Sequence, residues 1–206
     1  MNIYKKIGLL LIVFILSNII YGYFINIDNE SEKISLNESE RIPDDEYEVI
    51  SSFFIPQGTY PQSAKLVIEQ LTTNDKVGDS SFNGFENYTK IKLDASLIDD
   101  FKKKNANTYK LENKFSIQQK VVIISEKKRK DIFRDDVGWL RFYMNHPGSY
   151  SGIHEISRVG FNDNKTQALF YHGFQLDGDM AQGNLILLTK ENGKWIIKAY
   201  SREWIA

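Results

Sequence analysis

The sequence GNLILLTKENGKWIIKAYS, residues 183–201, decides the fold because it contains two strands and the turn that joins them. Apolar residues dominate both sides of a central Asn192-Gly193 pair. This pair is the strongest short signal of a β-hairpin, since a two-residue type I′ turn needs a positive φ angle at both central positions. We therefore expect strands over residues 183–189 and 194–201.

The turn also sets the register of this hairpin. If Glu191 faces Lys194, the pairs that follow are Leu188 with Ile197, and Ile186 with Ala199. Upstream, a period-two pattern covers residues 153–161 and 166–173, with an Asn/Asp-rich turn at 162–165. The four strands predict an antiparallel meander.

Two long helices are expected to cover one face of this sheet. The first begins at Pro43, which is tolerated in the first turn, and repeats Tyr47, Ile50 and Phe54 at three- and four-residue spacing. The second is expected over residues 125–147 because it carries a single apolar stripe. The stripe consists of Phe133, Val137, Leu140 and Met144.

Shorter elements complete the pattern. Residues 65–72 and 121–124 are typical of strands, residues 78–87 of a loop, and Asp94 of the N-cap of a short helix. The sequence thus predicts an α+β domain in which helices cover a curved antiparallel sheet, of the cystatin-like or NTF2-like kind.

An apolar run over residues 7–25 precedes this domain. As a helix it would be roughly 28 Å long, which matches the apolar thickness of a bilayer. We expect a membrane anchor; a cleaved signal peptide is the alternative, although the run lacks a good small-residue cleavage site, and a buried core helix is a third reading. Lys5 and Lys6 precede the run and mostly acidic residues follow it, so the N-terminus is expected in the cytoplasm and the domain outside.

The chain is therefore expected to have three parts. Residues 1–27 form the anchor or signal peptide, residues 28–42 an acidic flexible tether, and residues 43–206 a single α+β domain.

Composition excludes several classes of function. The 206 residues include 26 Lys and Arg against 27 Asp and Glu, a net charge of −1 that is too neutral for a nucleic-acid-binding protein. The chain has no cysteine, so disulfides, thiolate metal sites and cysteine nucleophiles are excluded. Phosphate-binding glycine loops are absent as well, and we expect neither a cofactor nor a metal.

Glu155 and His172 are the candidate catalytic pair. If Phe161 pairs with Thr166 in the expected hairpin, Glu155 lies opposite His172, which suits general acid–base chemistry or two metal ligands. The alternative is a partly buried histidine bonded to a carboxylate. For His154 we expect only a surface or capping role.

A second motif, GSYSG at residues 148–152, superficially resembles a nucleophile loop. It does not match G-x-S-x-G, because neither serine has glycine two positions before and two positions after it.

Two basic features could bind a partner. Arg158 is expected either as a half-buried guanidinium paired with a carboxylate such as Glu203, or as an exposed charge between strands. The basic run of the second helix could contact an acidic partner or form a solvated face. It consists of Lys127, Lys128, Arg129 and Lys130.

The motifs WLRFYMNHPG at residues 139–148, SRVGFN at 157–162, QALFY at 167–171 and LTKENGKW at 188–195 resemble a family of small bacterial exported proteins without assigned function. The resemblance covers roughly the last 160 residues. It implies a bacterial, exported, single-domain protein and no particular activity. Many members of that family carry a cysteine pair where this chain has LDGDMA at residues 176–181.

These observations favour a non-catalytic domain, tethered to the outer side of a bacterial inner membrane, that binds a protein partner in an immunity-type or envelope-associated role. A periplasmic or secreted protein is the alternative if the N-terminal run is cleaved. A small envelope hydrolase using Glu155 and His172 is the alternative function. Binding of an apolar ligand in the concave face of the sheet is the third possibility.

Overall fold

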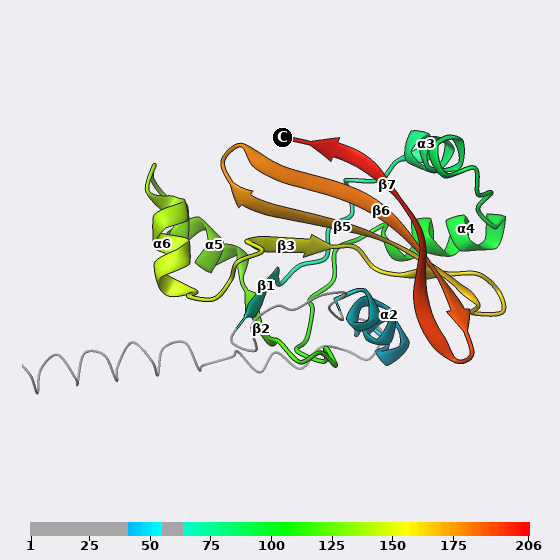
Figure 1. Ribbon diagram of the computed structural model, residues 1–206, viewed down its shortest axis with the longest axis horizontal. Coiled ribbons are helices and arrows are strands. Elements are labelled where there is room, and N and C mark those ends of the chain that lie inside the picture. The colour runs from blue at the N-terminus through cyan, green and yellow to red at the C-terminus, as the bar shows by residue number, and fades with distance from the viewer. Residues whose placement is uncertain (1–40, 55–63) are drawn as a thin grey trace, which may run out of the picture. The chain divides into compact units, whose positions relative to one another are not determined.

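A mixed, open sheet of seven strands organises the α+β domain in the computed structural model (Figure 1). The structure describes residues 41–54 and 64–206. The expected anchor or signal peptide at residues 7–25 and nearly all of the expected tether lie outside these residues. Ile42, assigned to the end of the tether, is only 2 % exposed and belongs to the core.

The elements follow one another as helices and strands in alternating groups. The helices are α2 (Asp44–Phe54), α3 (Asp79–Thr89), α4 (Ala95–Lys104), α5 (Glu126–Ile132) and α6 (Gly138–Asn145). The strands are β1 (Lys65–Glu69), β2 (Lys120–Ile124), β3 (Ile153–Ile156), β4 (Gly160–Phe161), β5 (Gln167–Asp177), β6 (Met180–Glu191) and β7 (Lys194–Ile205).

The sheet order is β2-β1-β3-β5-β6-β7, and β4 pairs with β5. The pairs that β5 forms with β3, β4 and β6, and the pair of β6 with β7, are antiparallel, as expected. In contrast, β1 pairs in parallel with both β2 and β3. The sheet is therefore mixed, not antiparallel throughout. A parallel pair needs a long crossover, and α3 and α4 supply it between β1 and β2.

The β6–β7 hairpin has the expected turn. Asn192 and Gly193 have φ angles of 51° and 79°, and Leu188 faces Ile197. Beyond that pair a bulge adds one residue to β7, so that Ile186 faces Tyr200 instead of Ala199. The predicted register is confirmed near the turn and wrong beyond the bulge.

The single helix expected over residues 125–147 is two helices, α5 and α6. The chain turns between them because Phe133 packs against the start of α6, where a Cβ at Gly138 would lie 2.6 Å from Phe133 Cδ1. Of the expected stripe, only Phe133 packs against the core, whereas Val137, Leu140 and Met144 are 53–73 % exposed. Residues 78–87, expected as a loop, lie mostly in α3.

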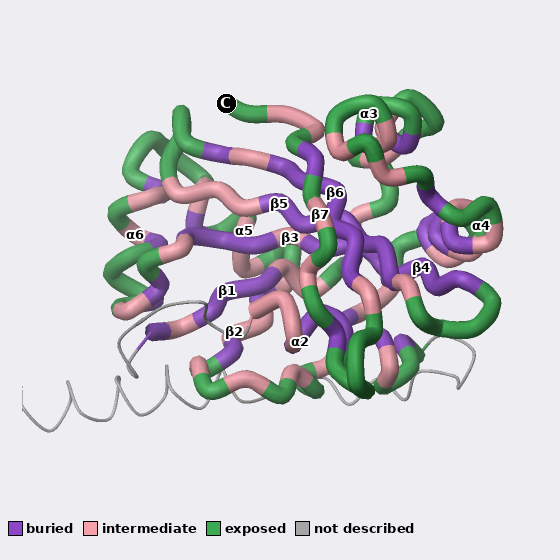
Figure 2. Tube along the Cα trace, turned by 45° about the vertical axis from the view of Figure 1, so that its right-hand side comes forward, coloured by how far each residue is buried: buried purple, intermediate pink, exposed green. Residues whose placement is uncertain are grey.

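Helices cover both faces of the sheet. On one face α2 packs over β1, β3, β5 and β6. On the other face α3 and α4 cover one end of the strands while α5 and α6 cover the other end (Figure 1). Buried residues accordingly run along the central strands (Figure 2).

We expect Trp195→Ala to destabilise the domain by roughly 3–5 kcal/mol, because Trp195 is 7 % exposed and packs with Leu188 in the core beneath α2. The matched control is Ile196→Ala, next along β7 and 45 % exposed, which should cost under about 1 kcal/mol. Urea unfolding of both variants measures the difference, and equal losses would contradict the assigned core face.

Candidate functional site

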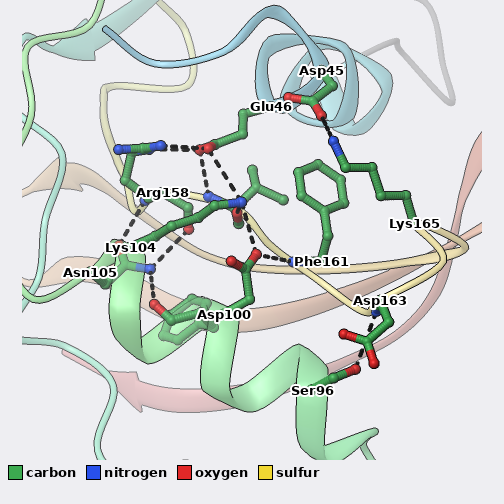
Figure 3. A network of polar contacts seen from close by, with 12 residues as sticks. Asp45, Glu46, Ser96, Asp100, Lys104, Asn105, Arg158, Phe161, Asp163 and Lys165 are labelled. Atoms are coloured by element: carbon green, nitrogen blue, oxygen red, sulfur yellow. Dashed lines mark hydrogen bonds and ion pairs between the residues drawn. The ribbon is translucent and has the colours of Figure 1, made fainter. Parts of the chain in front are cut away.

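A buried ion pair joins α2 to the segment between β3 and β4 (Figure 3). Glu46 is fully buried and Arg158 is 6 % exposed. Arg158 donates two hydrogen bonds to the Glu46 carboxylate, from Nε at 2.8 Å and from a terminal nitrogen at 2.6 Å. The backbone N–H of Val159 donates a third, at 2.9 Å.

Helix α4 extends this network. Lys104 lies 2.8 Å from the Asp100 carboxylate and 3.6 Å from that of Glu46. Asn105 accepts a hydrogen bond from the Arg158 backbone N–H at 2.8 Å and donates to the Arg158 carbonyl at 3.1 Å. The ion pair therefore connects three separate parts of the chain.

Arg158 is thus an internal residue. It is paired with Glu46, not with Glu203, which instead accepts a hydrogen bond from Ser201. The guanidinium also lies 4.4 Å from the centre of the Tyr109 ring. Its expected role as a surface interaction residue does not fit this burial.

Glu155 and His172 are not brought together. Glu155 pairs with Gly173, whereas His172 pairs with Ile156, so the two side chains lie on opposite faces of the sheet. The expected register was wrong in two places. Phe161 pairs with Ala168, not with Thr166, and one extra residue lies between β3 and β4, where Arg158 and Val159 bond to Asn105 and Glu46. A one-residue shift moves a side chain to the other face.

Glu155 instead belongs to a polar group that includes Tyr171 and Trp204. The Tyr171 hydroxyl donates to Glu155 at 2.9 Å and accepts from the Trp204 indole at 2.8 Å. The facing residues Gly173 and Gly183 leave room for it, since a Cβ at either would collide with the Tyr171 hydroxyl. Burial, and then the charge of Glu155, raise the pKa of Tyr171.

The side chain of His172 contacts His154, which is buried and does not have the surface or capping role expected for it. His154 Nδ1 lies 2.8 Å from His172 Nε2, and His154 Nε2 lies 2.9 Å from Ser151 Oγ. The two imidazoles stack with ring centres 5.1 Å apart. They are 5 and 6 % exposed, and Phe53, Phe54 and Phe174 surround them.

Burial controls the charge of this histidine pair. It lowers the pKa of His154 to about 3, and burial together with the neighbouring His154 lowers the pKa of His172 well below its ordinary value. Both rings are therefore neutral at pH 7. The sequence shows Ser151 three residues before His154. Recognising His172 as the partner of His154, however, depends on the register between β3 and β5 that the structure shows.

The basic run lies on α5, where part of it is used within the domain. Arg129 lies 2.7 Å from Glu69 of β1, and Lys130 lies 2.5 Å from Glu126. Burial raises the pKa of Glu69 while Arg129 opposes that shift. Lys127 is exposed.

Three apolar side chains at the start and along the outer side of α6 are exposed to solvent. We define the α6 surface as Val137, Leu140 and Met144, which are 53 %, 64 % and 73 % exposed. On the inner side of α6, Phe142 is fully buried against Phe133 and Trp139. Tyr143 donates to the Leu176 carbonyl at 2.7 Å, which ties α6 to the end of β5.

Within residues 41–54 and 64–206, no three His, Cys, Asp or Glu side chains gather into a group able to hold a metal ion. In the same part of the chain, none of the helices is long and apolar enough to cross a membrane. Comparison of the chain with protein-family models, curated proteins and solved structures found no match.

We expect Arg158→Met to destabilise the domain by about 3–5 kcal/mol, because it removes both guanidinium hydrogen bonds from the buried Glu46 carboxylate and leaves only the more distant Lys104 as its cation. The double variant Glu46→Gln/Arg158→Met removes both charges and should lose less. Chemical denaturation of the single and double variants measures this coupling. A double variant less stable than Arg158→Met would argue against the pair.

The histidine pair predicts an acid-sensitive fold. Because the folded-state pKa of His154 is about 3, against an ordinary 6.5, the unfolded chain binds more protons between these values, so stability falls as the pH falls below about 6.5. The loss is about 1.4 kcal/mol per pH unit for each such histidine. Unfolding at pH 7, 5.5 and 4.5 should show a smaller loss in His154→Gln/His172→Gln, and parallel curves would contradict the assignment.

Proposed function

We propose that this chain is a non-catalytic, membrane-tethered domain that binds a protein partner through the α6 surface. The observation that carries the proposal is the exposure of Leu140 and Met144 along one side of α6, together with that of its N-cap residue Val137. Exposed apolar side chains that cluster on one element are typical of interaction sites.

The α6 surface is also held rigid. Phe142 anchors α6 to the core, and the Tyr143 hydroxyl bond fixes the helix beside β5. A rigid surface loses little conformational entropy on binding, which favours affinity. Methionine is also enriched in interface cores.

The chemistry of the partner follows from the neighbouring charges. Helix α5 packs beside α6 and presents Lys127 to solvent, together with Lys130, which is exposed and paired with Glu126. We expect the partner to offer an apolar groove bordered by carboxylates, since complementary charges steer association. An immunity-type or envelope-associated role suits such a partner.

The location rests on the N-terminal sequence. The apolar run at residues 7–25, with Lys5 and Lys6 before it, supports a single-pass anchor in a bacterial inner membrane with the domain outside. A periplasmic or secreted protein remains the alternative. For the fold, α2 packed on the antiparallel strands supports a cystatin-like or NTF2-like arrangement.

The two other functions have less support. The Glu155–His172 hydrolase needs side chains that lie on opposite faces of the sheet. An apolar ligand beneath α2 would have to displace core side chains, because Ile50, Ile68 and Phe170 pack together there.

We expect Leu140→Glu/Met144→Glu to weaken partner binding by at least tenfold, because it places two charges in the apolar contact. Folding should be little affected, since both side chains are exposed. The control is Tyr88→Glu, at a position 74 % exposed on α3.

The measurement uses the full chain in its membrane. A photocrosslinker at Val137, the member of the α6 surface that the double variant leaves unchanged, should capture a defined protein. The affinity of that purified protein should fall in the double variant but not in Tyr88→Glu. Capture that persists in the double variant, or binding only to protein-free anionic vesicles, would contradict the proposal.

A further inference from the structure

Three side chains link the loop before β3 to the centre of the sheet. Ser151 Oγ lies 2.9 Å from His154 Nε2, and His154 Nδ1 lies 2.8 Å from His172 Nε2. Both histidines are buried, whereas Ser151 is half-buried on a loop beside the exposed Tyr150. Of these three side chains, Ser151 is thus the most exposed to solvent.

The order of these groups is that of an activated nucleophile. A hydroxyl contacts one nitrogen of an imidazole, and the other nitrogen of the same ring contacts a third group that orients it. We propose that Ser151 is a nucleophilic serine that activated acyl groups modify at Oγ, with His154 as the general base and His172 as a positioning residue. This site is independent of the α6 surface.

The proposal specifies the protonation of both rings. His154 Nδ1–H donates to the unprotonated Nε2 of His172, which leaves His154 Nε2 to accept the Ser151 hydroxyl proton. Burial keeps both rings neutral at pH 7, so this acceptor is available without prior deprotonation.

The reaction is a balanced acyl transfer. Ser151 Oγ attacks the carbonyl carbon of an ester while its proton passes to His154 Nε2. The bond from that carbon to the leaving oxygen then breaks, and the proton passes from His154 to the departing alkoxide. The products are an acylated Ser151 and an alcohol, and no oxidant, reductant or metal takes part.

The local structure holds Ser151 toward His154. Gly152, the next residue, has a φ angle of +72° and approaches the Gln175 carbonyl so closely that no Cβ would fit. Ser149 donates to the His146 carbonyl at 2.6 Å, which fixes the start of the loop. These contacts fix the backbone on both sides of Ser151, and the hydrogen bond with His154 orients its side chain.

The surroundings define the substrate class. Phe53, Phe54 and Phe174 exclude water from the histidine pair but give little stabilisation to an imidazolium ion. His154 is consequently a weak base, suited to donors with good leaving groups. We expect reaction with activated esters such as p-nitrophenyl acetate, and with fluorophosphonates, which test the same nucleophile.

The experiment treats the purified full chain in detergent with p-nitrophenyl acetate or a fluorophosphonate probe. Mass spectrometry should find the adduct on Ser151. Ser151→Ala should abolish labelling, whereas Ser80→Ala, at an exposed serine of α3, should keep it. His154→Gln should slow labelling at least 100-fold, the lower range for loss of a general base.

The role of His172 has its own readout. His172→Phe removes the acceptor for His154 Nδ1–H and should slow labelling about tenfold and change its pH profile, while His172→Gln restores an acceptor and part of the rate. If the histidine variants do not fold, the position of the adduct and the labelling of Ser151→Ala still test whether Ser151 is the nucleophile. A wild-type protein without an adduct, an adduct at another residue, or undiminished labelling of Ser151→Ala would overturn the proposal.

Discussion

The buried pair of Glu46 and Arg158 is the interaction on which the arrangement of the other elements depends. Its carboxylate accepts three hydrogen bonds, one of them from the backbone of Val159, and α4 adds Asn105. These bonds draw Arg158 and Val159 out of the ladder that β3 and β4 form with β5. The extra residue reverses the face on which β3 presents its side chains relative to β4, which is why His172 lies beside His154 and not beside Glu155.

Local signals in the sequence were sufficient where a few neighbouring residues determine the conformation. Asn192-Gly193 gave the turn and the Leu188–Ile197 pair, and Asp94 caps α4 by accepting from the Ser96 backbone N–H. The parallel pairing of β1 with β2 has no such signal, because their partners lie more than 50 residues apart in the sequence. The prediction of a Glu155–His172 site was wrong for the same reason. The register between β3 and β5 depends on the bond from Arg158 to Glu46, which lies 112 residues away in the sequence.

Helix α6 shows a different limit of periodicity. The spacing of Leu140 and Met144 correctly indicates one side of a helix, which begins after Val137, but spacing alone does not say what that side contacts. The core is built instead by Phe133, Trp139 and Phe142, whose rings pack against one another and require the turn before Gly138. An apolar stripe that the domain does not bury is a reason to look for a partner, and it is the basis of the proposed binding surface.

Polar groups bind β3 to β5 on both faces of the sheet. On one face His154 contacts His172, and on the other Glu155 accepts from Tyr171. Apolar side chains could fill these positions with equal or greater stability, since burial of polar groups carries a desolvation cost. Such groups do specify register, however, because a one-residue slip of β3 would leave all four without their partners. The same geometry that fixes β3 against β5 also leaves one nitrogen of His154 directed at Ser151, so a group that sets the register also creates the chemically distinctive site of the domain.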